Sequence, residues 1–188
     1  DDPAKLGERI LGAEVKGSID DLTMNDCTHV ILGIGDNLAR KRIVESKDFN
    51  WISLVHPFSC VHESVPVGEG TLVCAGTVIQ PEAKIGRHAI VNTSSNVEHH
   101  CSIGDYTHLA SAHLAGACNV EEGGFLGARC IILPKLTVGA WATVGAGAVV
   151  TKPVVSGDVV VGVPARPMEK KALSRVRLAH EFSPLVGA

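Results

Sequence analysis

Aliphatic side chains recur at every sixth position over the central part of the chain. The first series runs in one unbroken register through Val61, Val67, Val73, Ile79, Ile85, Val91, Val97, Ile103 and Leu109. A second series contains Val120, Leu126, Ile132, Val138, Val144 and Val150. Neither the 3.6-residue period of a helix nor the two-residue period of a strand produces a repeat of six. A repeat of fixed length indicates stacked structural units.

Small or short side chains lie two positions before nearly all of these aliphatics, as Thr71, Ala83 and Ser95 illustrate. A triangular coil of short strands explains both features, because each aliphatic points inward near a corner and leaves room for only a small neighbour. Such coils bury a continuous narrow core by stacking. The pattern therefore predicts a mainly β protein, with a parallel β-helix of hexapeptide repeats over residues 57–166.

The two series are out of register with each other. Leu109 and Val120 are 11 residues apart, one short of two repeats. We therefore expect a locally irregular coil between them. Irregularity in a repeat commonly marks a functional face, although a tolerated loop deletion is an equally simple explanation.

Residues 1–56 have a different pattern, which predicts a truncated α/β Rossmann-like segment. Residues 28–32 suggest a strand, 33–37 a glycine turn, 38–47 a helix and 49–55 another strand. A glycine turn that opens a helix is a candidate anion site, because free backbone N–H groups point there. Glycine is also simply what a tight turn needs.

Apolar residues at helical spacing follow Met168, so residues 167–188 are expected to form a helix and tail. A helix that caps the open end of the β-helix is the simplest interpretation; a membrane or partner helix is the alternative.

Composition and charge exclude several classes of function. The net charge of −3 argues against a nucleic-acid-binding surface. Residues 129–188 nevertheless carry 8 Lys and Arg against 3 Asp and Glu, so a polyanionic cofactor would bind best there, with Lys152 and Arg166 as candidate phosphate ligands. No apolar run approaches the ~20 residues of a membrane span. No secretion signal is evident either, and we expect a cytoplasmic protein.

Six cysteines could suggest disulfides. Cys101, Cys118 and Cys130, however, occupy the small inward position of the repeat. We therefore expect them to be buried free thiols.

Four of the nine histidines cluster as His99, His100, His108 and His113. They could be solvated corner residues, or one could be a general base, since an imidazole titrates near neutral pH. A zinc site of the gamma-class carbonic anhydrase kind is a remote alternative. That resemblance stops at His108 and His113, because no third histidine lies near residues 72–74, and we expect no metal.

A more specific similarity begins with the run VNTSSNVEH at residues 91–99 and continues through residues 101–108. It extends to residues 114–116, 125–127 and 162–165, to Asp1 and Asp2, and to residues 34–37 with Arg40. These stretches resemble bacterial sugar acyltransferases, the group of sialic-acid O-acetyltransferases and nucleotide-linked 4-amino-sugar N-acetyltransferases of glycan biosynthesis. The resemblance implies a left-handed β-helix, a homotrimer with active sites between subunits, and roughly 35 family residues ahead of Asp1.

The same resemblance implies roles for individual residues. His99 would be the base, and His100 stands where the family usually has an Asp or Glu that orients it. The residues expected to line acetyl-CoA are Asn92, His108, Gly116, Ala128 and Ala146. Those expected near the nucleotide of the sugar are Asp1, Asp2, Gly35 and Asn37.

We therefore expect acetyl-CoA-dependent N-acetylation of a nucleotide-linked amino sugar, by direct transfer. The alternatives are O-acetylation of a sialic acid or another sugar, and a non-catalytic hexapeptide-repeat scaffold.

Overall fold

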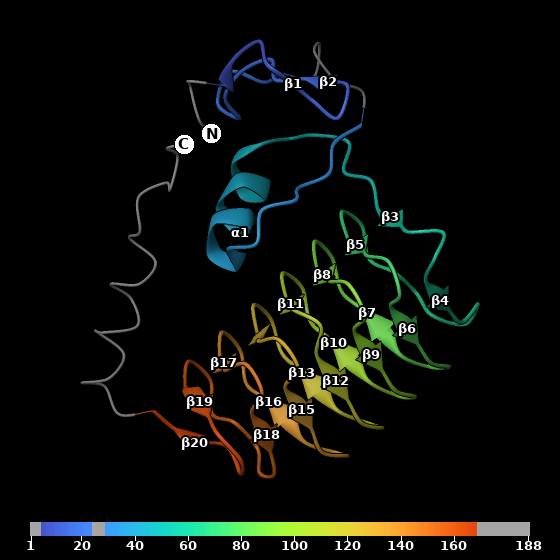
Figure 1. The fold of residues 1–188 in the computed structure, drawn as a ribbon, viewed down its shortest axis with the longest axis vertical. Helices are drawn as coiled ribbons and strands as arrows, with labels where there is room; N and C mark the ends of the chain where they lie inside the picture. Colours follow the sequence, from blue (N-terminus) through green and yellow to red (C-terminus); the bar gives the residue numbers. More distant parts are fainter. Residues whose placement is uncertain (1–4, 24–28, 169–188) are drawn as a thin grey trace.

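A left-handed parallel β-helix forms most of the computed structural model, which describes residues 5–23 and 29–168 (Figure 1). The chain visits three sheets in turn. The eight-stranded sheet contains β3 (Leu54–Val55), β5 (Leu72–Val73), β8 (Ile90–Val91), β11 (His108–Leu109), β14 (Phe125–Leu126), β17 (Thr143–Val144), β19 (Val159–Val161) and β20 (Arg166–Pro167). The six-stranded sheet contains β4 (Cys60–Val61), β6 (Val78–Ile79), β9 (Asn96–Val97), β12 (His113–Leu114), β15 (Ile131–Ile132) and β18 (Val149–Val150). The four-stranded sheet contains β7 (Lys84–Ile85), β10 (Ser102–Ile103), β13 (Asn119–Val120) and β16 (Thr137–Val138).

Each coil has three corners, which we number by the sheet that they follow. Corner 1 follows the eight-stranded sheet, corner 2 the six-stranded sheet and corner 3 the four-stranded sheet. A residue with left-handed backbone stands at most corners, such as Ser94 (φ 57°), His100 (φ 60°) and Tyr106 (φ 57°). This conformation costs a non-glycine residue roughly 1 kcal/mol. The parallel ladders on either side hold it in place.

The core consists of the inward positions that the six-residue period predicted. Val73, Leu109 and Ile132 have no exposed surface, and the small neighbours Ala83 and Ala148 have none either. Buried hydroxyls at the same small positions are satisfied by carbonyls of the next coil. Thr71, for example, donates to the carbonyl of Gly86 over 2.7 Å. The predicted β-helix is therefore confirmed.

The three cysteines of the repeat, Cys101, Cys118 and Cys130, are buried free thiols, as expected.

The register break lies between Leu109 and Leu114, where consecutive inward residues are 5 rather than 6 positions apart. Ser111 makes the shortened corner 1 with a φ of 59°, and its hydroxyl donates to the carbonyl of Thr93 over 2.6 Å. Ala112 fills the small inward position. The second series thus begins at Leu114, one repeat earlier than the sequence suggested.

The N-terminal part contains α1 (Asn37–Ser46) and an antiparallel pair, β1 (Arg9–Ile10) and β2 (Ala13–Glu14). Asp36 caps α1 by accepting a hydrogen bond from the N–H of Ala39, so the predicted helix is confirmed. Of the two strands expected on either side of it, the first contributes only an isolated parallel bridge from Val30 to Trp51, and the end of the second forms β3, which belongs to the β-helix. The residues described before the β-helix therefore do not display the Rossmann-like sheet that we expected.

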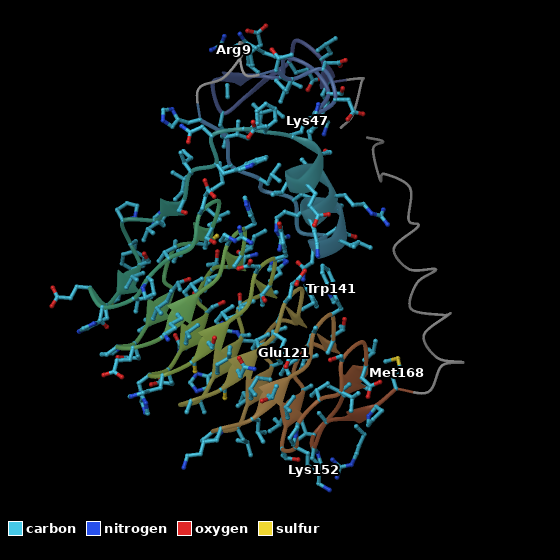
Figure 2. The ribbon with its side chains drawn as sticks, turned by 180° about the vertical axis from the view of Figure 1, so that it is seen from behind. Arg9, Lys47, Glu121, Trp141, Lys152 and Met168 are labelled. Atoms are coloured by element: carbon cyan, nitrogen blue, oxygen red, sulfur yellow. The ribbon has the colours of Figure 1, made fainter. Side chains whose placement is uncertain are left out.

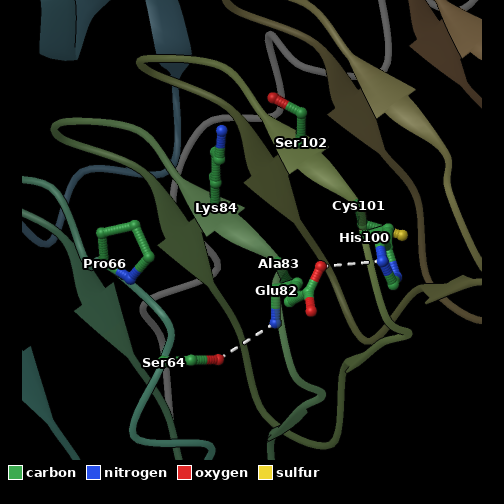
Figure 3. A pocket seen from close by; sticks show the side chains of 8 residues that line it. All are labelled: Ser64, Pro66, Glu82, Ala83, Lys84, His100, Cys101 and Ser102. Atoms are coloured by element: carbon green, nitrogen blue, oxygen red, sulfur yellow. Dashed lines mark hydrogen bonds and ion pairs between the residues drawn. The ribbon is translucent and has the colours of Figure 1, made fainter.

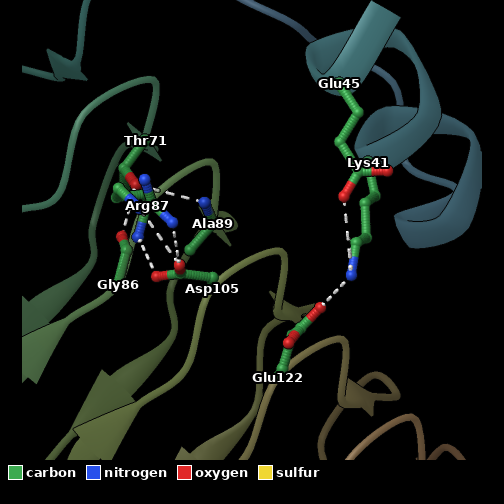
Figure 4. Close-up of polar contacts among 8 residues, drawn as sticks. All are labelled: Lys41, Glu45, Thr71, Gly86, Arg87, Ala89, Asp105 and Glu122. Carbon is green, nitrogen blue, oxygen red and sulfur yellow. Dashed lines mark hydrogen bonds and ion pairs between the residues drawn. The ribbon is translucent and has the colours of Figure 1, made fainter.

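Arg40 joins α1 to the β-helix at corner 3. Its guanidinium is 1% exposed and donates to the carbonyls of Ile34 (2.7 Å), His88 (2.8 Å) and Tyr106 (2.7 Å). Burial lowers the pKa of Arg40 to about 10, and the negative charge of Asp36 partly opposes this. Figure 4 shows a second link nearby, the ion pair between Lys41 of α1 and Glu122.

Arg87 and Asp105 pair across successive coils at corner 3, with 2.9 Å between Arg87 Nη2 and Asp105 Oδ2 (Figure 4). Bridges between coils of this kind hold the corner to which α1 is attached.

No helix within residues 5–23 and 29–168 is both long and apolar enough to cross a membrane. The helix expected at residues 167–188 falls almost entirely outside the described residues, so it stays a prediction.

Candidate functional site

The two adjacent histidines, His99 and His100, lie exposed at corner 2. Their Nδ1 atoms are 2.9 Å apart and their rings are perpendicular, at 89°. His100 also contacts Glu82, with 2.8 Å between His100 Nε2 and Glu82 Oε2 (Figure 3). A carboxylate and two imidazoles therefore form one line along this corner.

Gly116 lies directly against His99 on the next coil. A Cβ at Gly116 would be 2.8 Å from Cε1 and 2.9 Å from Nε2 of His99. The imidazole edge that carries Nε2 therefore faces a position with no side chain. A basic nitrogen beside open backbone is what a base needs to reach an incoming nucleophile.

A different histidine, His108, is buried on the outer face of the eight-stranded sheet. Its Nδ1 lies 3.1 Å from the carbonyl of Gly35, and its Nε2 lies 3.3 Å from Nδ2 of Asn92. The carbonyl of Gly35 can only accept a hydrogen bond, and the amide nitrogen of Asn92 can only donate one. His108 therefore carries its proton on Nδ1. Burial lowers the pKa of His108, the bond to Gly35 opposes this, and the positive charge of Arg40 acts in the same direction as burial. His108 is thus a neutral imidazole with both nitrogens occupied, which suits positioning better than proton transfer.

Asn37 joins the start of α1 to the same face. Its amide nitrogen donates to the carbonyls of Gly123 (3.0 Å) and Gly124 (3.2 Å), and its oxygen accepts from Arg40 (2.9 Å). The side chain is 8% exposed and its polar atoms are all engaged. Asn37 therefore shapes the site, and its amide makes its hydrogen bonds to other groups of the protein.

An open cavity of about 720 Å³ lies between the start of α1 and the eight-stranded sheet. It is lined by Gly35, Asn37, His108, Phe125, Trp141 and Thr143. Phe125 packs edge-on to His108, with ring centres 5.3 Å apart. This lining of backbone, aromatic surface and a neutral imidazole suits a polar ring system such as a sugar or a nucleobase.

Ala128 and Ala146 are exposed at corner 1, on successive coils, and Asn92 lies at the same corner. Lys152 and Arg166 line a smaller pocket of about 230 Å³ near the last coils, with Asp158. Figure 2 shows Trp141 below α1 and Lys152 at the far end of the β-helix.

The structure thus distributes the predicted residues over four places, of which corner 1, with Ala128 and Ala146, is one. His99, His100 and Gly116 meet at corner 2; Gly35, Asn37, Asn92 and His108 meet at the α1 cavity; Lys152 and Arg166 meet at the last coils. Corner 2 joins the six- and four-stranded sheets, so it lies opposite the eight-stranded face that carries the cavity. One chain does not bring its own His99 to this cavity. Asp1 and Asp2 fall outside the described residues.

The sequence analysis missed Glu82, Phe125 and Trp141 as site residues. Glu82 had a usable signal, because it precedes His100 by 18 residues, which is one full coil. Trp141 had none, since its place in the cavity depends on where α1 docks.

The alternative of a zinc site finds no support in the geometry of the two histidines. His108 is on β11 and His113 on β12, so they belong to different sheets. Over residues 5–23 and 29–168, no three His, Cys, Asp or Glu side chains are grouped to hold a metal ion.

Comparisons with known proteins find related structures, although no family model matches the chain. PerB from Caulobacter crescentus, solved with CoA and GDP-perosamine, is 34% identical; the match covers 85% of this chain and 81% of PerB, with a TM-score of 0.81. The acetyltransferase domain of PglB from Neisseria gonorrhoeae FA1090, solved with acetyl coenzyme A, is 30% identical with a TM-score of 0.79; the match covers 85% of this chain and 81% of that domain.

Curated relatives match over shorter stretches. The bifunctional protein GlmU from Saccharophagus degradans is 29% identical over 121 residues, which is 55% of this chain and 27% of GlmU. The matched stretch therefore spans about a quarter of that relative.

Proposed function

Because the chain belongs to the bacterial sugar acyltransferases of the hexapeptide-repeat β-helix class, we propose that it transfers an acetyl group from acetyl-CoA to the amine of a nucleotide-linked sugar. The observation that carries this proposal is His99 at corner 2, with its Nε2 edge facing the bare backbone of Gly116. The CoA and GDP-perosamine in the PerB structure support the choice of both substrates.

The reaction is a direct transfer with His99 as the general base. The sugar amine attacks the thioester carbonyl, a C–N bond forms, and Nε2 of His99 takes the proton that the amine releases. The C–S bond then breaks and the CoA thiolate leaves, finally taking up that proton. The missing side chain at position 116 lets the imidazole of His99 pack against the backbone, because a Cβ there would lie only 2.8–2.9 Å from the ring.

Each substrate has a place of suitable chemistry. The sugar nucleotide occupies the α1 cavity, where Gly35 and Asn37 lie near its nucleotide and Trp141 offers an aromatic face. Acetyl-CoA runs along the corners past Ala128 and Ala146, with its phosphates near Lys152 and Arg166.

A homotrimer completes the site. His99 and the α1 cavity lie on opposite sides of one β-helix, so they can act on one substrate only if they come from adjacent chains. Three-fold packing of the prisms brings corner 2 of one chain toward the eight-stranded face of the next.

The test is the rate of free-thiol release from acetyl-CoA in the presence of a panel of nucleotide-linked amino sugars. We expect His99→Asn to lower kcat by at least ~10²-fold, the usual effect of losing a general base. His56→Asn is the matched control, because His56 is an exposed histidine at corner 1 of the first coil, where its ring accepts a hydrogen bond from the N–H of Phe58. Equal rates for wild type and His99→Asn would remove His99 from the mechanism.

A further inference from the structure

A carboxylate is connected to His99 through His100, although the residue directly after His99 in the sequence is not acidic. Glu82 Oε2 is 2.8 Å from His100 Nε2, and His100 Nδ1 is 2.9 Å from His99 Nδ1. Glu82 and His100 also line the same pocket of about 440 Å³, as Figure 3 shows. The three side chains are therefore connected end to end.

Hydrogen-bond chemistry fixes the direction of this line. Glu82 as a carboxylate can only accept, so His100 Nε2 must be the donor and carries a hydrogen. In neutral His100, Nδ1 is then an acceptor, which requires His99 to donate from its own Nδ1. The Nε2 of His99, at the edge that faces Gly116, is left with a free lone pair.

The backbone holds Glu82 and His100 in place. Glu82 and His100 occupy equivalent corner positions on successive coils, with φ of 61° and 60°. The N–H of Glu82 donates to the hydroxyl of Ser64 over 3.1 Å, and the N–H of His100 donates to the carbonyl of Pro81 over 3.2 Å. Since both residues are anchored by neighbouring coils, their side chains meet without rearrangement of the main chain.

We propose that Glu82, acting through His100, positions and polarises His99 as the base of this enzyme. The proposal rests on the proposed function and adds two positioning residues to it. Glu82 holds His100 in the tautomer that accepts from His99, and its negative charge stabilises the imidazolium that forms when His99 takes the substrate proton. Glu82 thereby does the work of the carboxylate that the family usually carries at the position of His100.

The kinetic test compares isosteric variants of Glu82. Glu82→Gln should lower kcat about tenfold with little change in KM, because one charge-assisted hydrogen bond is lost while the substrate contacts remain. Glu82→Asp should recover part of the rate. Glu63→Gln is the control, since Glu63 is an exposed carboxylate at corner 2, two coils from His99, and it should behave as wild type.

A second arm tests whether Glu82 acts through His100. In His100→Glu a carboxylate sits beside His99 directly, so adding Glu82→Gln should cost little or should raise the rate by removing a like charge. If Glu82→Gln lowers kcat by the same factor in both backgrounds, the two residues act independently and the proposal is wrong.

A third arm needs no turnover. Nitrogen-15 NMR of labelled histidines should show His99 protonated on Nδ1 in wild type and a mixture of tautomers in Glu82→Gln, with His99→Asn assigning the signal. Ordered tautomers in a protein that acetylates no sugar would support the hydrogen-bonded line and reject the proposed function. An active enzyme whose rate and tautomers are unaffected by Glu82→Gln would overturn the proposal.

Discussion

Burial lowers the pKa of a second histidine, His88, as it does that of His108. It is 3% exposed, stacks on Tyr106 with ring centres 5.5 Å apart and meets the edge of Trp51. Its Nδ1 is buried and has no hydrogen-bond partner. Burial lowers the pKa of His88 below its ordinary value, with the charge of Glu69 opposing and that of Arg87 reinforcing the shift.

The sign of the resulting pH effect follows from linkage. An unfolded imidazole takes up a proton near pH 6.5, whereas the folded His88 does so only at lower pH, so acidification through this range favours the unfolded state. We expect the Tm of wild type to fall between about pH 7.5 and pH 5.5. His88→Phe, which keeps the ring contacts and cannot titrate, should lose less Tm over the same interval. Equal losses would show that His88 does not contribute.

Gly116 gives a second prediction at this scale. Alanine there would bring a Cβ within 2.9 Å of His99 Nε2, so the imidazole must move. We expect Gly116→Ala to lower kcat about tenfold or more, because misplacing a base costs rate, while Tm stays close to wild type. Gly33→Ala is the control, since a Cβ at Gly33 meets no atom within 4 Å. A fully active Gly116→Ala enzyme would contradict the role of this edge.

At the scale of elements, Arg40 makes the most deeply buried polar contacts between α1 and the β-helix, beside those of Asn37 and Lys41. Lysine has one charged point and cannot reproduce three divergent hydrogen bonds to Ile34, His88 and Tyr106. Arg40→Lys therefore leaves buried carbonyls unpaired, at about 1–3 kcal/mol each. We expect faster hydrogen exchange in α1 and unchanged protection in β8, β11 and β14. Uniform acceleration would mean that α1 and the β-helix open together.

The repeat was predictable because each inward position imposes the same demand on every coil. Residues such as Val97 and Ile132 fill identical sites, so the period alone locates them. The prediction of two N-terminal strands was wrong in their extent, because apolar residues there serve a different kind of packing. Leu32, Phe49 and Trp51 are apolar enough to suggest strands, but they pack as a cluster with α1 and form only one bridge.

The contacts within the site also divide into those that sequence spacing predicts and those that it does not. The pair of Glu82 and His100 follows from the length of one coil and could be found from sequence spacing. The bond between His108 and Gly35 spans 73 residues and depends on how α1 docks, which no local pattern encodes.

At the scale of the whole molecule, the β-helix exposes large apolar side chains. Leu54, Val55 and Phe58 are 45%, 47% and 77% exposed, and Ile131 and Leu133 are 38% and 39% exposed. Burying such surface favours self-association. For a trimer of 19.7 kDa chains we expect 59.1 kDa by light scattering at micromolar concentration. A monomer under these conditions would exclude a site shared between chains.

The central claim is that an acetyl group moves from acetyl-CoA to the amine of a nucleotide-linked sugar. Analysis of the sugar product by mass spectrometry, before and after mild alkali, tests this most directly. We predict one alkali-stable acetyl group per sugar, CoA released in equal amount, and both products formed at least ~10²-fold more slowly with His99→Asn. An alkali-labile acetyl group, or a sugar that gains none while wild type binds both substrates, would contradict the account.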